Sequence, residues 1–329
     1  MPRPRILYYS LLEYQPAARA LLEDNFEVIE RQNPDQDDDQ TLGNIEACFA
    51  PLGFTFDAAK MDRCPDLKAI LTNTTGVPHV DMAAAAQRGI EVFSLKDEQA
   101  FLDTITPTAE HTFGLMLALT RNLPQGFDAV KAGTWNRFDH GGRAMLSRLS
   151  LGIIGLGRLG RKVARYADVF GMTVNYYDPY VEAPTDGPAR CATLAELVAA
   201  SDVITLHAPA NDETADLINA DVMAQFRPHA VFVNTARAEL VDETALLAAL
   251  DDGRLAGAAV DVLKGEYAPA FDPLSHPLVQ YARSHDNLII TPHIGGSTQD
   301  AWSETQARVV ELAIDYFSQR ADVMQGGGQ

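Results

Sequence analysis

Short apolar runs alternate with helix-like stretches along most of the chain. The runs have the length of buried strands, and the stretches between them repeat their apolar positions with a helical period. Parallel strands joined by crossover helices give this alternation, because each helix covers one face of the sheet on its way back. The pattern therefore predicts an α/β fold whose sheets are mostly parallel.

The first third of the chain contains five such runs and leads into a longer apolar helix. That helix is predicted over Thr108–Arg121, closed by Pro124, and we expect it to be buried and to form the bridge into a second domain. The predicted strands before it are Ile6–Tyr9, Phe26–Ile29, Ala47–Ala50, Ala69–Thr72 and Ile90–Phe93, and the predicted helices among them are Pro16–Leu22 and Met82–Arg88.

The rest of the chain predicts a second sheet, of six strands. A final helix, about Gln299 to Gln319, has no strand after it, so we expect it to return to the first domain. The predicted domains are residues 1–103 with 298–329, and residues 104–297; both are doubly wound parallel sheets, with a cleft between them. The second sheet's predicted strands are Leu151–Ile154, Met172–Tyr177, Val203–Leu206, Ala230–Val233, Ala256–Val260 and Leu288–Ile290, with helices Leu194–Ala200 and Thr244–Asp252.

A glycine-rich turn follows the first strand of the second sheet. Gly155, Gly157 and Gly160 have the spacing G-x-G-x-x-G and open a helix-like segment. The first glycine allows a tight turn, the second lets the backbone approach a pyrophosphate, and the third lets helix and strand pack closely. Asp178 ends the next strand, at about the distance expected of an acid that binds a ribose 2′-hydroxyl. The segment predicts a dinucleotide site, and Asp178, which would repel a 2′-phosphate, favours NAD over NADP.

The composition indicates a globular protein without nucleic-acid or membrane partners. Apolar residues make up 47% and charged residues 22%, and the formal net charge is −19, which would repel nucleic acid and anionic membranes. No apolar run is long enough to cross a bilayer or to form a signal-peptide core. The three cysteines lack the spacing of a zinc site or a disulfide framework. We expect a cytoplasmic protein without a metal ion, and a solvated loop at the aspartate-rich segment 35–39.

Polar residues follow four strands of the second sheet at their carboxyl ends, where open α/β sheets bind ligands. Among them, Arg237, Glu266 and His293 form a set suited to moving a hydride onto a ketone. Arg237 would bind a carboxylate through two parallel hydrogen bonds and stabilise a developing alkoxide. His293 would donate the proton, and Glu266 beside the imidazole would raise its pKa. His207 follows another strand and fits a cofactor-lining or structural role better than that of the acid.

These residues lie in motifs by which the chain resembles the D-isomer-specific 2-hydroxyacid dehydrogenases. The resemblance covers about residues 67–308, and with it we expect a flavodoxin-like substrate domain and a Rossmann NAD-binding domain. It implies an enzyme that interconverts a D-2-hydroxy acid and its 2-oxo acid, and a homodimer formed through the cofactor domains. The motifs are Thr75–Asp81, Thr108–Thr112, Gly155–Gly160, Leu206–Pro209 with Glu213-Thr214, Val233–Arg237, Val260-Asp261 with Glu266, and Pro292–Gly296.

The resemblance also implies roles for individual residues. It gives Arg237, Glu266 and His293 the catalytic roles argued above. It assigns the substrate carboxylate to the backbone around Thr75, Gly76 and Val77, and the nicotinamide carboxamide to Asp261. The residues expected to bind NAD are Gly155, Gly157, Arg158, Leu159, Gly160, Asp178, Pro179, His207, Pro209, Thr214, Thr235, Ala236, Asp261, Gly295 and Gly296.

The chain departs from the family's usual pattern next to the catalytic glutamate. Tyr267 follows Glu266 where the family commonly has proline, and the segment from Glu266 to His293 is longer than usual. The path of this segment is therefore open.

Other functions remain open on the same scaffold. Formate dehydrogenases share the fold but place a glutamine where Glu266 stands, whereas phosphite oxidation is compatible with the carboxylate. An NAD(H)-sensing, corepressor-like binding protein could retain the same three residues. The expected substrate is a small anionic 2-oxo or 2-hydroxy acid, and Arg137, Arg143 and Arg148 either hold a second anionic group of it or lie on the surface.

Overall fold

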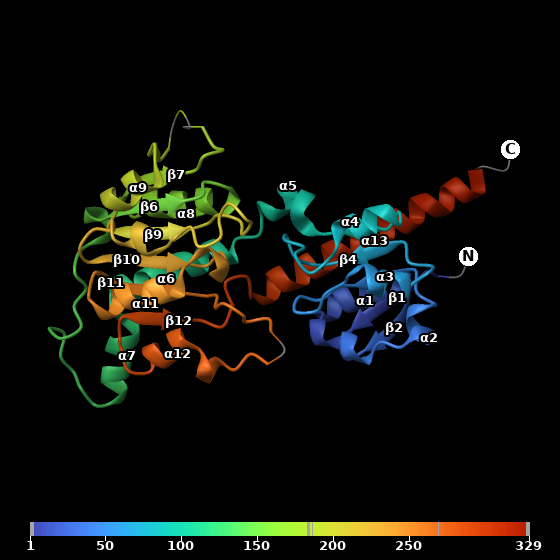
Figure 1. Cartoon of the computed structure of the whole chain (residues 1–329), viewed down its shortest axis with the longest axis horizontal. Coiled ribbons are helices and arrows are strands. Elements are labelled where there is room, and N and C mark those ends of the chain that lie inside the picture. The colour runs from blue at the N-terminus through green and yellow to red at the C-terminus, as the bar shows by residue number, and fades with distance from the viewer. Residues whose placement is uncertain (1–2, 183–184, 186, 269, 327–329) are drawn as a thin grey trace. The chain divides into compact units, whose positions relative to one another are not determined.

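The chain forms two compact units (Figure 1). The computed structural model describes residues 3–182, 185, 187–268 and 270–326. Unit 1 consists of Met1–Ile105 with Thr298–Gln329, and unit 2 of Thr106–Ser297. Each unit is a parallel sheet with buried cores on both faces, so the predicted α/β class of two doubly wound sheets is confirmed. Among the described residues, no helix is both long and apolar enough to cross a membrane.

Unit 1 contains a five-stranded parallel sheet. Its strands are β1 (Arg5–Tyr9), β2 (Glu27–Arg31), β3 (Ala47–Phe49), β4 (Ala69–Leu71) and β5 (Glu91–Phe93), and its α-helices are α1 (Pro16–Asn25), α2 (Asp39–Leu42), α3 (Ala58–Asp62), α4 (Met82–Gln87), α5 (Gln99–Leu102) and α13 (Gln299–Gly326). The strand order β2-β1-β3-β4-β5 is that of flavodoxin-like folds. Alternate residues of β1 enter opposite cores: Ile6 packs with α1 and α13, and Leu7 with α3 and α4.

The last helix, α13, belongs to the core of unit 1. Val309 and Val310 are fully buried among residues of β1 and α1. The ring of Phe317 meets that of Phe26 edge-on, with 5.8 Å between the ring centroids. Figure 1 shows α13 in red along unit 1, next to α1. The end of the described chain thus completes a core that the first strand begins.

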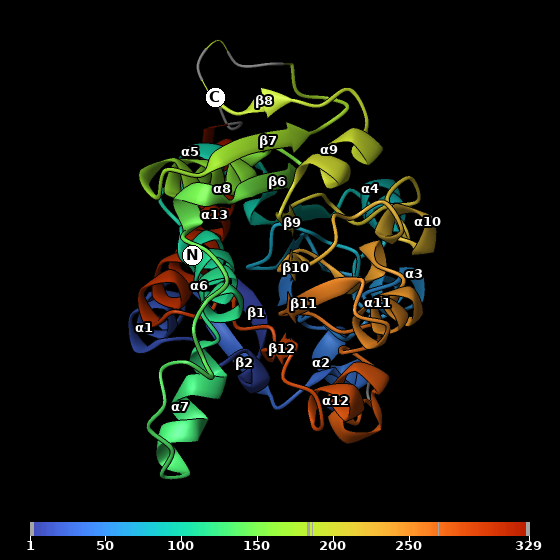
Figure 2. The same cartoon turned by 90° about the vertical axis from the view of Figure 1, so that its left-hand side faces the viewer.

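Unit 2 contains a seven-stranded parallel sheet. Its strands are β6 (Ser150–Ile154), β7 (Thr173–Tyr177), β8 (Ala189–Arg190), β9 (Val203–Leu206), β10 (Ala230–Asn234), β11 (Leu255–Val260) and β12 (Leu288–Ile290), and its α-helices are α6 (Pro107–Thr120), α7 (Leu123–Lys131), α8 (Arg158–Val169), α9 (Leu194–Ala200), α10 (Ala220–Met223), α11 (Glu243–Asp251) and α12 (Pro277–Ala282). Figure 2 shows the sheet with α6 and α8 on one face and α9, α11 and α12 on the other.

The strand order of unit 2 is β12-β11-β10-β9-β6-β7-β8, and six of these strands were predicted. The prediction of six strands is corrected to seven, because the two-residue edge strand β8 is exposed and has no apolar run. Since β6 lies between β7 and β9, the order of strands reverses there. Open α/β sheets bind ligands at such a switch point, outside the carboxyl ends of the strands.

Pro124 lies after the end of one helix and in the first turn of the next. The predicted apolar helix is α6, which ends at Thr120, and α7 starts at Leu123 with Pro124 in its first turn. Between them Asn122 adopts a φ of 49°, which turns the chain. Proline suits the first turn of a helix because its missing N–H would have no partner within the helix there. The same residue that closes the predicted helix therefore opens α7.

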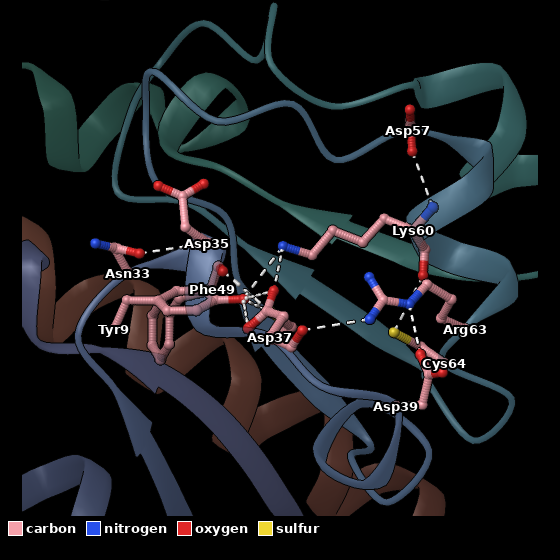
Figure 3. Close-up of polar contacts among 11 residues, drawn as sticks. Tyr9, Asn33, Asp35, Asp37, Asp39, Phe49, Asp57, Lys60, Arg63 and Cys64 are labelled. Carbon is pink, nitrogen blue, oxygen red and sulfur yellow. Dashed lines mark hydrogen bonds and ion pairs between the residues drawn. The ribbon is translucent and has the colours of Figure 1, made fainter. Parts of the chain in front are cut away.

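The aspartate-rich segment 35–39 is anchored at its centre, so the prediction of a solvated loop is wrong for Asp37 (Figure 3). The side chain of Asp37 is 3% exposed, and its carboxylate lies 2.7 Å from Nζ of Lys60. The hydroxyl of Tyr9 donates to the same carboxylate at 2.8 Å, and Arg63 pairs with Asp39 at 2.8 Å. This pairing could not be predicted from the charges within the segment, because the cation Lys60 lies in α3 and the cation Arg63 directly follows it.

We expect Asp37→Asn to lower the free energy of unfolding by about 3 kcal/mol, because it leaves the ammonium of Lys60, whose side chain is only 12% exposed, without a counter-charge. Equilibrium urea unfolding measures the change. Asp35→Asn, at an exposed position of the same segment, is the matched control and should change stability by less than about 0.5 kcal/mol. Equal stability of the two variants would show that the Lys60–Asp37 pair contributes nothing specific.

Candidate active site

The glycine turn between β6 and α8 leaves room above its middle glycine. Gly155 has a φ of 89°, and a Cβ there would lie 2.8 Å from the backbone of His207, so no larger residue fits. A Cβ on Gly160 would overlap the carbonyl oxygen of Gly155. A Cβ on Gly157 would meet no described atom within 4 Å, and Gly157 is the N-cap of α8. Open space in front of a helix N-terminus is what a pyrophosphate requires, so the turn fits a dinucleotide.

Asp178 ties the end of β7 to the glycine turn. Its Oδ2 accepts a hydrogen bond from the backbone N–H of Leu156 at 2.9 Å, and its Oδ1 accepts one from Tyr180 at 2.9 Å. Each carboxylate oxygen has two lone pairs, so both can accept a further hydrogen bond. Arg190 of β8 donates to the backbone carbonyl of Asp178 at 3.3 Å. The acid is thus held in place at the edge of the turn, with acceptor capacity to spare.

Glu266 and His293 form a hydrogen-bonded pair. The Nδ1 atom of His293 lies 2.8 Å from Oε1 of Glu266, and the side chains are 31% and 16% exposed. The hydroxyl of Tyr267 lies 3.0 Å from the same Nδ1 atom. Burial, followed by the charge of Glu266, raises the pKa of Tyr267 to about 12, so its phenol keeps its proton near neutrality. With Nδ1 held by two partners, Nε2 is the ring nitrogen left for chemistry.

The segment that bears His293 is bound to the buried carboxylate of Asp261. This carboxylate accepts the backbone N–H groups of Ile294 at 2.9 Å and Gly295 at 2.7 Å, and the hydroxyl of Thr291 at 2.5 Å. Burial alone would raise the pKa of Asp261, but hydrogen bonds from His111, Thr291 and the two N–H groups outweigh it and hold that pKa below its usual value. Asp261 therefore positions the segment after β12; its contact with the nicotinamide stays a prediction.

Arg237 lies in a turn closed by Asn234, the last residue of β10. The side-chain amide of Asn234 donates to the carbonyl of Arg237 at 3.0 Å and accepts the N–H of Ala236 at 2.9 Å. The guanidinium of Arg237 donates to the carbonyl of Ala236 at 2.7 Å, and its charge acts on Tyr267. The structure thus brings the neighbourhood of Arg237 together with the Glu266–His293 pair.

His207 differs from His293 in its surroundings. Desolvation by burial lowers the pKa of His207 to about 4, so the ring is neutral near neutral pH. Its Nε2 lies 3.0 Å from the hydroxyl of Thr205. Its Nδ1 is buried without a hydrogen-bond partner among the described residues. A neutral ring with an unpaired nitrogen beside the glycine turn accords with a cofactor-lining position.

The other predicted cofactor residues lie around the carboxyl ends of the strands in unit 2. Arg158 and Leu159 form the first turn of α8, and Pro179 follows β7. Pro209 and Thr214 lie in the loop after β9, where the hydroxyl of Thr214 donates to the carbonyl of Pro209. Thr235 and Ala236 follow β10, and Gly295 and Gly296 follow β12.

The predicted substrate residues belong to unit 1. Thr75 and Gly76 are exposed, and Val77 is half-buried, in the loop after β4. The hydroxyl of Thr74 donates to the carbonyl of Gly76 at 2.5 Å. His79 links this loop to the one after β3, since its Nε2 lies 3.0 Å from the carbonyl of Ala50. The loop is therefore shaped by its own contacts and presents backbone groups at its surface.

Four residues that support the site were not predicted to do so. Asn234 and Thr291 stand in or beside motifs that were singled out, but neither was assigned a role. His111 stands in such a motif, and its Nε2 lies 3.0 Å from the hydroxyl of Thr291 and 3.4 Å from Asp261. Tyr267 was noted only as a departure from a family pattern. In each case the contact depends on tertiary structure.

Comparison with known proteins identifies similar sequences. The model of the family described as "D-isomer specific 2-hydroxyacid dehydrogenase, NAD binding domain" matches residues 113–295. The D-3-phosphoglycerate dehydrogenase of Bacillus subtilis is 32% identical over 299 residues, which cover 90% of this chain and 54% of that protein. The enzyme of the same name from Mycobacterium bovis is 34% identical over 328 residues, covering 95% and 58%. The chain thus spans little more than half the length of these relatives.

A solved structure of similar length also matches. The D-lactate dehydrogenase of Aquifex aeolicus, in complex with NAD and lactic acid, superposes with a TM-score of 0.83. The two sequences are 28% identical, and the match covers 98% of each chain. A protein from Thermus thermophilus superposes with a TM-score of 0.82 at 32% identity, covering 94% of this chain and 96% of that one.

We expect Asp261→Asn to lower the free energy of unfolding by about 1–3 kcal/mol, because an amide cannot accept all the hydrogen bonds that the carboxylate accepts. The difference from wild type should be largest near neutral pH. Because the folded-state pKa of Asp261 is lowered, the stabilisation is complete above the unfolded-state value of about 3.9 and is lost as the pH falls below it.

Urea unfolding of both proteins between pH 3 and pH 7 tests this expectation. Asp286→Asn, at an exposed position just before β12, is the control and should behave as wild type at each pH. A stability difference that grows as the pH falls would contradict the assigned hydrogen bonds.

Proposed function

The chain belongs to the D-isomer specific 2-hydroxyacid dehydrogenase family, whose NAD-binding domain it contains, and from this premise we propose that it interconverts a D-2-hydroxy acid and its 2-oxo acid. The observation that carries the proposal is the pair of Glu266 and His293, 2.8 Å apart in the unit that contains the glycine turn. An imidazole paired with a carboxylate is suited to exchanging a proton with a hydroxyl group. The other half of the reaction is the transfer of a hydride, which the cofactor would exchange with the substrate when bound.

The residues around the glycine turn fit NAD. The pyrophosphate would occupy the space above Gly157 at the N-terminus of α8, and Arg158 and Leu159 would flank it. Asp178 would accept hydrogen bonds from the adenosine ribose with its remaining lone pairs. His207, with its unpaired Nδ1, and Asp261 would lie along the rest of the cofactor, together with Pro179, Pro209, Thr214, Thr235, Ala236, Gly295 and Gly296.

We assign the proton transfer to Nε2 of His293. NAD, when bound, would accept the hydride that leaves C2 of the hydroxy acid. His293 would take the hydroxyl proton in that direction and return it to the carbonyl oxygen in the other. Glu266 stabilises the imidazolium, because its carboxylate accepts the Nδ1–H. The proton thus moves between a fixed ring nitrogen and one substrate oxygen.

Arg237 would hold the substrate and respond to its change of charge. A guanidinium pairs with a carboxylate through two parallel hydrogen bonds, which orients a 2-oxo acid. It also stabilises negative charge that develops on the carbonyl oxygen. We propose that the backbone of Thr75, Gly76 and Val77 binds the same carboxylate. The class of substrate is therefore a small 2-oxo or 2-hydroxy acid.

We expect His293→Ala to reduce the rate of NADH oxidation at least about 100-fold, because no other described group replaces its Nε2. The loss of NADH absorbance measures the rate with glyoxylate, hydroxypyruvate, pyruvate, phosphohydroxypyruvate and sulfopyruvate, each also assayed with NADPH. Binding of NADH, followed by fluorescence titration, should stay within about twofold of wild type. His285→Ala, at an exposed histidine, is the matched control and should retain full activity.

Other outcomes of this assay point to other functions. Tight NADH binding without turnover of any acid would favour an NAD(H)-sensing binding protein. Oxidation of phosphite or formate, with no turnover of 2-oxo acids, would favour a dehydrogenase of that type. Equal rates with NADH and NADPH would contradict the role of Asp178 in selecting NAD.

We further propose that the protein forms a homodimer through unit 2. Three aromatic side chains of α7 and the loop after it are largely exposed: Phe127 at 66%, Trp135 at 88% and Phe138 at 81%. Figure 2 shows α7 projecting away from the sheet of its unit. Large exposed apolar side chains gathered on one segment are typical of an interface. The same patch on a second copy would meet it about a two-fold axis.

Arg137 and Arg143 also lie in this loop. Arg137 stacks on Phe138, with 4.9 Å between the guanidinium carbon and the ring centroid, and Arg143 donates to the carbonyl of His229 at 3.0 Å. These contacts support a structural role for both residues. A role of Arg137, Arg143 or Arg148 in holding a second anionic group of the substrate stays a prediction. The three buried, unpaired cysteines Cys48, Cys64 and Cys191 accord with our proposal of a cytoplasmic location.

We expect the double variant Trp135→Glu, Phe138→Glu to shift the protein from two chains to one chain of 35.8 kDa, because four carboxylates would be desolvated in each dimer. Light scattering after size-exclusion chromatography measures the mass. Leu274→Glu, a charge added at another exposed apolar residue of unit 2, is the control and should leave the mass unchanged. A wild-type protein of one-chain mass would contradict the proposal.

A further inference from the structure

Two consecutive side chains converge on one nitrogen of His293. Oε1 of Glu266 lies 2.8 Å from Nδ1, and the hydroxyl of Tyr267 lies 3.0 Å from the same atom. The rings of Tyr267 and His293 have centroids 5.8 Å apart and are tilted by 52°. The phenol therefore approaches the edge of the imidazole at a nitrogen that already has a partner.

A tight turn makes this convergence possible. Gly265 has a φ of 79°, which residues with a side chain rarely adopt. The N–H of Glu266 donates to the carbonyl of Leu263 at 3.2 Å, and that of Ala268 donates to Gly265 at 2.8 Å. In an extended strand, neighbouring side chains would point to opposite faces. Here the turn directs Glu266 and Tyr267 to the same ring.

The turn is itself anchored to the helix α11. Glu243 is the first residue of that helix, and its Oε1 accepts a hydrogen bond from the backbone N–H of Lys264 at 2.9 Å. Oε2 of the same carboxylate lies 3.3 Å from Nε2 of His276, a buried residue further along the segment. Tyr267 therefore directly follows a turn that is anchored to α11, although the residue itself is 41% exposed.

The two partners of Nδ1 differ in the hydrogen bonds that they can make. An ionised carboxylate only accepts, whereas a phenol both donates and accepts. When Nδ1 has its proton, Glu266 accepts it and the phenol oxygen can share it. The proposed reaction moves the proton of Nε2 and leaves that of Nδ1 in place. The phenol oxygen thus gives the Nδ1–H a second acceptor beside Glu266.

We propose that Tyr267 is a positioning residue for His293, which together with Glu266 fixes the imidazole so that Nε2 keeps one direction through the reaction. The inference rests on the proposed function, since it assigns Nε2 the proton transfer. Tyr267 acts only through His293 and has no part in the chemistry of its own.

The electrostatic consequence follows from the groups around the ring. Glu266 and Asp261 are negative, Arg237 is positive, and Glu239 lies within electrostatic range of the phenol. His111 faces the same segment through Thr291. With an ionised Glu266 at 2.8 Å, the neutral ring keeps its proton on Nδ1, and the phenol oxygen then favours the charged ring over the neutral one. Removing the hydroxyl should therefore take one acceptor away from the charged ring.

We test this with Tyr267→Phe, and with Tyr281→Phe as the matched control at a tyrosine that stacks on His285. Histidine labelled with 13C at Cε1 gives the pKa of His293 by NMR without substrate, and the signal is assigned by its absence in His293→Ala. We expect Tyr267→Phe to lower the midpoint by about half a pH unit. Glu266→Gln should lower it further, and Tyr281→Phe should leave it unchanged.

Kinetics provide the second readout. Tyr267→Phe should lower kcat about 3–10-fold with KM unchanged, because it alters the ring during the reaction and leaves substrate binding intact. The midpoint of the kcat profile against pH should shift in the direction seen by NMR. Tyr267→Leu should give the same shifts, which assigns them to the hydroxyl group rather than to the aromatic ring.

The outcomes separate this inference from the proposed function. If Tyr267→Phe and Tyr267→Leu have the wild-type midpoint while His293→Ala is inactive, the positioning role is overturned and the proposed function stands. If His293→Ala retains full activity, the proposed function itself fails. A lower kcat in Tyr267→Phe with an unchanged midpoint in both readouts would indicate general destabilisation and also overturn the inference.

Discussion

The buried carboxylate of Asp261 is the contact on which the candidate site depends. It accepts hydrogen bonds from the hydroxyl of Thr291 before His293 and from the N–H groups of Ile294 and Gly295 after it. The segment after β12 is therefore tied on both sides of His293 to the residue that follows β11. His293 lies within it and has a φ of 53°, a conformation that a residue with a side chain adopts only where the surroundings impose it. A fixed backbone alone leaves the imidazole free to rotate about its side-chain bonds. The contacts of Glu266 and Tyr267 with Nδ1 restrict this rotation.

The sheet brings these groups together through its register. Asn234 pairs with Val260, and Val260 pairs with Ile290, so β10, β11 and β12 end side by side. Arg237 lies in the segment that follows β10, Glu266 in the segment that follows β11, and His293 in the segment that follows β12. Residues far apart in the sequence thus become neighbours because three parallel strands stop at one level. Substitutions that move one strand end would disturb all three groups.

Much of the fold could be predicted from the sequence, because buried parallel strands are continuous apolar runs. Val203–Leu206 and Leu288–Ile290 were predicted with their observed bounds. The exposed strand β8 contains no such run, and α7 begins too soon after α6 for a periodicity to separate them. Arg237, Glu266 and His293 were predicted as site residues from their chemistry. Asn234, Tyr267 and the pairing of Asp37 with Lys60 were not, because each depends on a turn or a contact that has no period in the sequence.

The position of α13 has a consequence for how the chain folds during synthesis. Unit 2 is continuous in sequence, whereas the core of unit 1 requires Val309 and Val310 from its second segment. A chain that emerges from the ribosome from its N-terminus can therefore complete unit 2 first. Until α13 follows, one face of the sheet of unit 1 is covered by α1 but lacks the part of its cover that α13 supplies. The earlier segment of unit 1 then waits, with apolar surface exposed, for a segment that is made after unit 2.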